Sequence, residues 1–125
     1  MDIKKVVVIG SGTMGSGIAA HLCNAKVPVT LLDLTTEISK KARDRIFKSK
    51  PPLLLDKSQI DHIKVGNIND NFDVVKEADW VVEAVVERID IKHNIYEKIF
   101  KNRKEGAIVS SNTSSIPIKV LSEKL

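Results

Sequence analysis

The residues with the clearest chemical meaning are three glycines near the N-terminus, Gly10, Gly12 and Gly15, in the segment Gly-Ser-Gly-Thr-Met-Gly. They follow an apolar run and precede a segment of helical periodicity, which is the context of a dinucleotide-binding G-x-G-x-x-G loop. Glycines are needed there because the backbone must turn sharply and bring N–H groups and a helix N-terminus against a pyrophosphate. We therefore expect Gly10, Gly12, Thr13, Met14 and Gly15 to contact a bound dinucleotide.

A carboxylate, Asp33, follows the glycines at the distance typical of this motif, at the end of a second apolar run from Val29 to Leu32. A carboxylate in that position accepts hydrogen bonds from the ribose diol of adenosine and repels the 2′-phosphate of NADP. The sequence therefore favours NAD as the cofactor. The alternative for Asp33 is a role in capping the helix that follows, and one residue could serve both purposes.

A second polar cluster, Ser110 to Ser115, follows the last apolar run and consists of hydroxyl and amide side chains. Short polar side chains at a strand end suit the ribose and nicotinamide half of a dinucleotide. A plain turn-forming and capping role is an equal alternative on composition. Cys23 is the only cysteine, which excludes an intrachain disulfide and a cysteine metal cluster, and we predict no metal site.

These residues must be positioned by alternating strands and helices, because runs of the two periodicities follow each other along the chain. We predict strands over Val6 to Ile9, Val29 to Leu32, Ile63 to Val65, Trp80 to Ala84 and Ala107 to Val109, with Gly66 and Asn67 closing the third. We predict helices over Met14 to Asn24, Thr36 to Lys48, Asp56 to His62, Asn71 to Ala78 and Ile89 to Phe100, and a further helix start at Ser115 to Pro117.

Right-handed crossovers then predict an α/β fold of the Rossmann type. The expected sheet is parallel and doubly wound, with strand order 3-2-1-4-5, three α/β/α layers and a ligand cleft between the first and fourth strands. Apolar spacing predicts the buried helix faces. The inward residues should be Met14, Ile18 and Leu22 with small Gly15, Ala19 and Cys23 beside them, then Ile38, Ala42, Ile46 and Phe47, and finally Ile91, Ile95, Tyr96 and Ile99.

Length and composition indicate one domain over residues 1–125, with the 42% hydrophobic and 29% charged residues of a soluble globular protein. No apolar stretch approaches the roughly 20 residues of a membrane span, and no targeting segment precedes the first strand, so we expect a cytoplasmic location without a membrane partner.

Basic residues, which contribute to a net charge of +4, gather on and just after the second helix at Lys40, Lys41, Arg43, Arg45, Lys48 and Lys50. A solvated helix face is the favoured interpretation. Docking of a phosphate-rich ligand is the alternative. Nucleic acid is disfavoured as a partner because aromatic residues do not interleave these charges.

Three segments together resemble the NAD-binding domain of 3-hydroxyacyl-CoA dehydrogenases: residues 10–19, residues 78–88 with the pattern E-A-V-x-E, and Ser111-Asn112-Thr113-Ser114-Ser115. Lys50-Pro51-Pro52-Leu53 is similar to the form of the domain in large bacterial fatty-acid oxidation proteins. The resemblance implies that the complete enzyme oxidises L-3-hydroxyacyl-CoA to 3-oxoacyl-CoA with NAD in fatty-acid β-oxidation, so that acyl-CoA is its substrate.

The same resemblance implies roles for individual side chains. Asp33 would bind the adenosine ribose, and Glu87 and Lys92 would lie near the nicotinamide. Ser114 would lie beside the substrate hydroxyl and the cofactor, and Ser49 would contact CoA.

The family's catalytic histidine and its helical substrate-binding domain come after the Ser111–Ser115 loop, and these 125 residues do not contain them. His21, His62 and His93 are interpreted as solvated or satisfied side chains. We therefore expect the 125 residues to be monomeric and inactive alone. Two function classes stay open: the NAD-binding portion of a 3-hydroxyacyl-CoA dehydrogenase, or a stand-alone NAD-binding module without chemistry. Another NAD-dependent hydroxy-acid dehydrogenase is a weaker third alternative.

Overall fold

The computed structural model describes residues 4–49, 54, 57–84 and 89–111. Five parallel strands form one sheet: β1 (Val6–Ile9), β2 (Val29–Asp33), β3 (Ile63–Asn67), β4 (Trp80–Glu83) and β5 (Ile108–Ser111). Their order is β3-β2-β1-β4-β5, as predicted. The order reverses at β1, which pairs with both β2 and β4. The helices are α1 (Thr13–Asn24), α2 (Thr36–Lys48) and α3 (Ile89–Asn102), with two 3-10 helices, η1 (Lys57–His62) and η2 (Phe72–Glu77).

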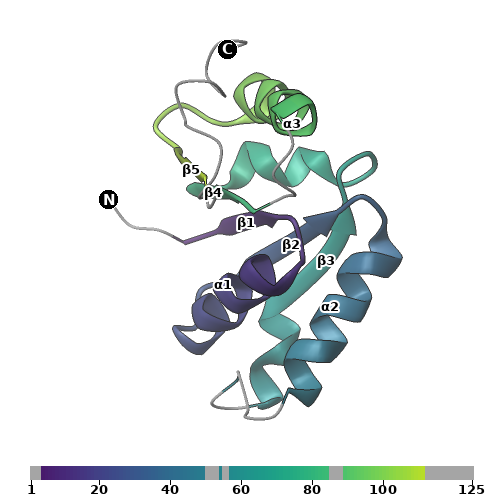
Figure 1. Ribbon diagram of the computed structural model, residues 1–125. Coiled ribbons are helices and arrows are strands. Elements are labelled where there is room, and N and C mark those ends of the chain that lie inside the picture. The colour runs from purple at the N-terminus through teal and green to yellow at the C-terminus, as the bar shows by residue number, and fades with distance from the viewer. Residues whose placement is uncertain (1–3, 50–53, 55–56, 85–88, 112–125) are drawn as a thin grey trace.

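The helices lie on both faces of the sheet, with α1 and α2 on one side and α3 on the other (Figure 1). Successive residues of β1 alternate between two hydrophobic clusters, so that Val6 and Val8 pack with α1 and α2 while Val7 and Ile9 pack with η2 and α3. All four are fully buried, which explains why this strand is an uninterrupted apolar run. The three-layer architecture expected from the sequence is therefore confirmed.

The fully buried face of α1 is its stripe of small residues, and the larger Ile18 and Leu22 are partly buried against the same core, as predicted. Gly15, Ala19 and Cys23 are buried against the sheet, and the small side chains let the helix axis approach the strands. Met14, expected to face inward, is 58% exposed. The helix is rotated toward its small face because its first turn packs directly on the loop after β1.

The inward face of α2 was also predicted incorrectly in part. Ala42 and Ile46 are buried as expected, but Ile38 and Phe47 are 40% and 39% exposed. The buried position between them is Ser39, whose hydroxyl donates to the carbonyl oxygen of Gly66 at 2.8 Å. A polar residue can face the core here because this hydrogen bond satisfies it, and periodicity counted on apolar residues misses that.

Several element boundaries also differ from the prediction. The segments expected as short α-helices before β3 and before β4 are the 3-10 helices η1 and η2. Gly66 and Asn67, expected to end β3, instead pair with Leu32 and Asp33 of β2. Gly66 is glycine because a Cβ there would lie 2.7 Å from the Asn71 side chain. The predicted helix start at Ser115 to Pro117 lies outside the described residues.

Asp79, just before β4, forms hydrogen bonds with the segment before β1 and with the segment after α3. Its carboxylate accepts hydrogen bonds from the backbone N–H groups of Lys4 and Lys5 and from the Lys104 ammonium. These donors, chiefly Lys104, lower the pKa of Asp79 from 3.8 to about 2. A carboxyl group with a lowered pKa stabilises the folded state fully above its unfolded pKa, and that stabilisation disappears as the pH falls through the folded value.

We expect Asp79→Asn to lower the urea midpoint of unfolding at neutral pH and to have a much smaller effect near pH 2, because that pH equals the lowered pKa and about half of the folded wild type then carries a protonated Asp79. The control is Asp73→Asn, which removes an exposed ion pair with Lys76 and should change the midpoint little. A midpoint difference for Asp79→Asn that is the same at both pH values would contradict this interpretation.

None of the helices in the described ranges has the length and apolar character that crossing a bilayer requires.

Candidate functional site

The loop after β1 uses its three glycines in three different ways. Gly10 has φ of 105°, in the region that favours glycine, and its N–H donates to the carbonyl of Leu32 at 2.7 Å. At Gly15 a Cβ would lie 1.7 Å from the carbonyl oxygen of Gly10, so α1 can pack on this loop only without a side chain. At Gly12 a Cβ would meet nothing within 4 Å, because this position faces open space.

The open space lies at the N-terminus of α1. Gly12 is the N-cap residue and supplies no side-chain cap, and the first helical hydrogen bond runs from the N–H of Ser16 to its carbonyl at 2.9 Å. The N–H groups of a helix's first turn have no partner within the helix. Together with the helix dipole they form a site that favours an anion such as a phosphate.

Asp33 lies beside this loop at the end of β2. Its Oδ2 atom accepts hydrogen bonds from the backbone N–H of Ser11 at 2.8 Å and from the Ser11 hydroxyl, and its Oδ1 accepts from the N–H of Leu34 at 2.7 Å. A carboxylate has about four acceptor positions, so capacity remains for a ligand hydroxyl. The alternative role for Asp33, capping the next helix, belongs instead to Thr35, which accepts from the N–H of Ile38.

A cavity of about 280 Å³ connects these groups. Its walls come from β1 and the glycine loop, from the ends of β2 and β4, from the turn after β3 and from α3. The lining residues are Ile9, Gly10, Ser11, Gly12, Thr13, Met14, Asp33, Leu34, Ile68, Ala84 and Ile95. Met14 and Leu34 are 58% and 60% exposed although they are large and apolar. Exposed apolar side chains at a cavity mouth are suited to contact a flat aromatic ligand.

Most of the predicted cofactor residues that the structure describes meet at this cavity. Gly10, Gly12, Thr13, Met14 and Asp33 line it. Gly15 lies directly behind, where it allows the helix to approach. Glu87 and Ser114, and the side chain of Lys92, lie outside the described residues, so their roles stay predictions.

Ser49 and Ser110 lie elsewhere. The Ser49 hydroxyl donates to the carbonyl of Ile46 at 3.0 Å at the end of α2, so a contact with CoA stays a prediction. Ser110 belongs to β5, and its hydroxyl accepts from the indole N–H of Trp80 at 2.8 Å. The Ser110 side chain therefore joins β5 to β4 by a hydrogen bond, which favours a structural role over the predicted ligand contact.

Sequence reasoning did not identify the apolar walls of the cavity. Ile68 follows β3 and is held there by a hydrogen bond from its N–H to the carbonyl of Asp33 at 3.0 Å. Ile95 was expected only as a core residue of the helix now seen as α3, and it also faces the cavity. No local pattern marks either residue, because each reaches the cavity through the packing of separate elements.

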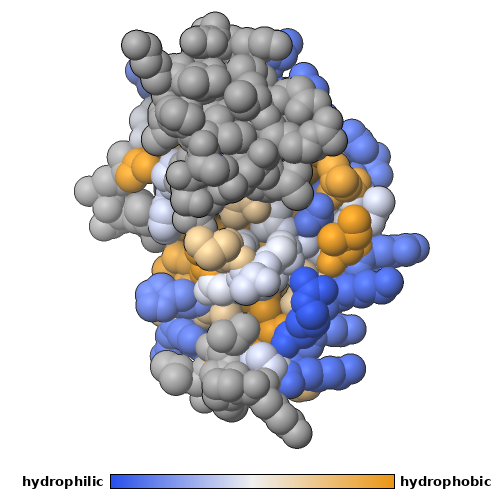
Figure 2. Space-filling model, in the orientation of Figure 1, coloured by the Kyte–Doolittle hydropathy of each residue, from blue (hydrophilic) through white to orange (hydrophobic). Residues whose placement is uncertain are grey.

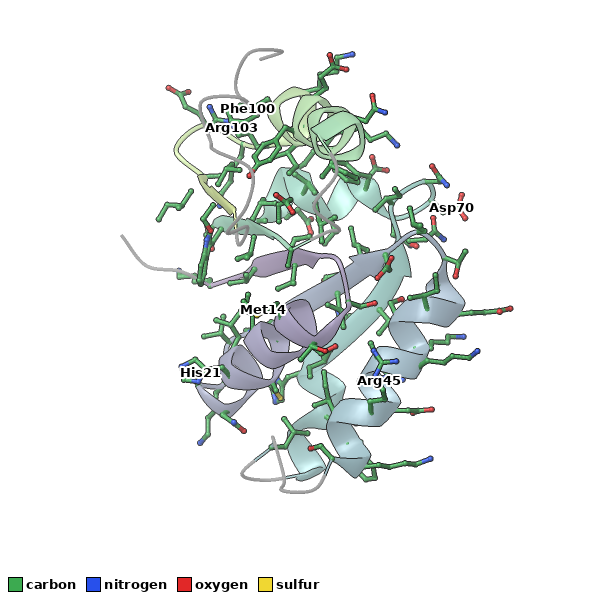
Figure 3. All side chains as sticks on the ribbon, viewed as in Figure 1. Met14, His21, Arg45, Asp70, Phe100 and Arg103 are labelled. Carbon is green, nitrogen blue, oxygen red and sulfur yellow. The ribbon has the colours of Figure 1, made fainter. Side chains whose placement is uncertain are left out.

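Two of the three histidines have described side chains, and neither lines the cavity. His21 is exposed on α1, and His62 is exposed at the end of η1. Figure 3 shows His21 near the end of α1 away from the glycine loop. This placement agrees with their interpretation as solvated side chains rather than as bases.

Comparison with known proteins gives a consistent result. A family model described as 3-hydroxyacyl-CoA dehydrogenase, NAD binding domain, matches residues 5–125. A Rickettsia felis protein, whose name describes a trifunctional enzyme of a fatty acid oxidation complex, is 43% identical over 99% of this chain and 18% of its own length. A Deinococcus radiodurans protein, named as a 3-hydroxyacyl-CoA dehydrogenase, is 42% identical over 94% of this chain and 36% of its own.

Among solved structures, (S)-3-hydroxybutyryl-CoA dehydrogenase from Ralstonia eutropha superposes with a TM-score of 0.79 and 32% identity. That match covers 96% of this chain and 44% of the other. The chain thus spans less than half the length of these similar proteins.

Proposed function

The chain belongs to the 3-hydroxyacyl-CoA dehydrogenase family, as the NAD-binding domain, and on that premise we propose that it holds the cofactor of an enzyme that oxidises L-3-hydroxyacyl-CoA to 3-oxoacyl-CoA. The observation that carries the proposal is the cavity in which the N-terminus of α1 and the Asp33 carboxylate face the same space. A cation-binding pocket would not place a helix N-terminus there, and an NADP pocket would not place a carboxylate there.

The residues around the cavity would hold the cofactor in one direction. The first turn of α1 would hold the pyrophosphate, where the absent side chain of Gly12 leaves room. Asp33 would hold the adenosine ribose, and Leu34 and Ile68 would provide apolar contacts for the adenine. The nicotinamide half would then be directed toward Ala84, just after β4. Glu87 follows there in the sequence, and we propose it, Lys92 and Ser114 as the residues around the nicotinamide and the substrate hydroxyl.

Bound NAD supplies a hydride acceptor. The alcohol must also lose a proton to a general base, and no histidine side chain within the described residues lines the cavity. Loss of general base catalysis alone lowers a rate by roughly two to four orders of magnitude. We therefore propose that residues 1–125 bind the cofactor without useful turnover, and that further residues of the complete enzyme supply the base and most of the acyl-CoA site. We also propose, from the sequence, that the protein is cytoplasmic and that these 125 residues are monomeric.

The test compares these 125 residues with a longer chain that continues along the natural reading frame. With acetoacetyl-CoA and NADH, we expect the 125 residues to bind NADH without consuming it and the longer chain to oxidise it, which absorbance would follow. A longer chain that binds NADH but leaves acetoacetyl-CoA unreduced would exclude the acyl-CoA assignment and favour a non-catalytic NAD-binding module. If the 125 residues oxidise NADH at the rate of the longer chain, the proposal that further residues supply the general base is excluded.

A further inference from the structure

The carbonyl oxygen of Ser11, inside the glycine loop, is held by two donors from different elements. The hydroxyl of Ser16, in the first turn of α1, donates to it at 2.9 Å in a buried environment. The Nη2 atom of Arg45, in the last turn of α2, donates to the same oxygen at 3.1 Å. Figure 3 shows Arg45 on the side of α2 that faces α1. A distant helix thus has a direct hydrogen bond to the loop that binds the dinucleotide.

This contact has a geometric consequence because a peptide unit is planar and trans. The carbonyl of Ser11 and the N–H of Gly12 belong to one peptide unit and point in opposite directions. A carbonyl anchored toward Ser16 and Arg45 therefore directs the Gly12 N–H away from α2. Gly12 lines the cavity, and its own Cβ position is open. The anchored carbonyl and the exposed amide are two ends of one rigid unit.

We propose that Arg45 is a positioning residue for the cofactor diphosphate: together with Ser16 it holds the Ser11–Gly12 peptide so that the Gly12 N–H faces the phosphate site. This inference rests on the proposed function, since it assumes that NAD lies on the glycine loop. A preoriented amide improves binding because less conformational freedom is lost when the ligand arrives. Arg45 itself does not line the cavity and acts only through Ser11.

The other basic residues of α2 have different surroundings. Many hydrophilic side chains project from the side of the molecule where α2 lies (Figure 2), and Lys41 and Lys48 share a shallow depression with Arg45. Arg43 donates to the carbonyl of Ile63 at the start of β3, 3.2 Å away. Arg43 is therefore a matched control, since it is an arginine on the same helix that bonds one backbone carbonyl far from the loop.

The experiment measures the dissociation constant of NAD by calorimetry for the wild type, Arg45→Met and Arg43→Met at low and at high salt. Loss of the positioning bond should weaken NAD binding roughly threefold to tenfold for Arg45→Met at both salt concentrations. Arg43→Met should stay within about twofold at high salt, where the general effect of a lost charge is screened. Equal weakening by both variants at high salt would overturn the proposal.

A second arm uses the uncharged donor. Ser16→Ala removes the other hydrogen bond to the same carbonyl without changing charge. Each single variant leaves one donor in place, so the double variant Ser16→Ala/Arg45→Met should weaken NAD binding by more than the product of the two single effects. If the weakening of NAD binding in the double variant equals the product of the two single effects, the two side chains do not act together on the Ser11 carbonyl.

The last arm separates this inference from the proposed function. The backbone amide resonance of Gly12, observed by NMR in the protein without cofactor, should shift in Arg45→Met and stay in place in Arg43→Met. An unmoved Gly12 resonance in Arg45→Met would overturn the positioning role even if NAD binds. If the Gly12 resonance shifts in Arg45→Met but the wild-type protein fails to bind NAD, the proposed function is refuted and the anchoring of the peptide stays established.

Discussion

Replacing Gly15 with alanine should abolish measurable NAD binding and lower the free energy of unfolding by about 1 to 3 kcal/mol. The added Cβ would lie 1.7 Å from the carbonyl oxygen of Gly10. That oxygen cannot swing aside freely, because it shares a planar peptide unit with the N–H of Ser11, which donates to the Asp33 carboxylate at 2.8 Å. Either the glycine loop or the start of α1 must move, and both form the phosphate site. Urea unfolding and calorimetric titration would measure the two effects.

The same helix offers controls that differ only in position. At Gly17 a Cβ would meet nothing within 4 Å, so Gly17→Ala should stabilise the protein by about 0.5 to 1 kcal/mol and leave NAD binding unchanged. Gly12→Ala also has free space in the unliganded protein. It should fold normally but weaken NAD binding, because its methyl group would enter the space of the diphosphate. Normal NAD binding by Gly15→Ala would refute the close approach seen here.

Replacing Asp33 with alanine should weaken NAD binding roughly tenfold to a hundredfold, which corresponds to the loss of a charged hydrogen bond of about 1.5 to 3 kcal/mol. The carboxylate keeps acceptor capacity beyond its bonds to Ser11 and Leu34. NADP should lose less affinity than NAD, because the repulsion of its 2′-phosphate disappears together with the charge. Titration of both cofactors into both proteins would measure the change in preference.

Asp33→Asn distinguishes the charge from the local structure. Its amide oxygen can still accept from the N–H of Ser11, so the glycine loop should keep its conformation. Because its side chain is neutral, the difference in binding affinity between NAD and NADP should become smaller. If Asp33→Asn and Asp33→Ala both left the preference for NAD unchanged, Asp33 would have no part in cofactor selection.

The fold could be predicted from the sequence because its central strand carries apolar residues on both faces. Val6 to Ile9 is apolar without interruption since β1 is covered on both sides, and right-handed crossovers leave few ways to connect such strands. The helix faces were predicted less well. Ser39 turns inward on α2 because a hydrogen bond to Gly66 satisfies it, and this partner is distant in the sequence.

The residues of the candidate site also fall into those that the sequence could identify and those that it could not. The glycines and Asp33 belong to a motif whose spacing encodes its geometry, so they could be identified directly. Ile68, Ile95 and Arg45 could not, because each meets the site through contacts between elements that are far apart in the chain. Gly66 illustrates the ambiguity of a single residue type, since it was interpreted as a strand end and instead makes room within β3 for Asn71.

The central claim is that the N-terminus of α1 and Asp33 together hold NAD, and calorimetric titration of the wild-type chain with NAD and with NADP tests it most directly. We predict saturable binding of one NAD per chain and binding of NADP at least roughly tenfold weaker, a difference of about 1.4 kcal/mol. A titration that stays flat at millimolar NAD, or equal affinity for the two cofactors, would contradict the account.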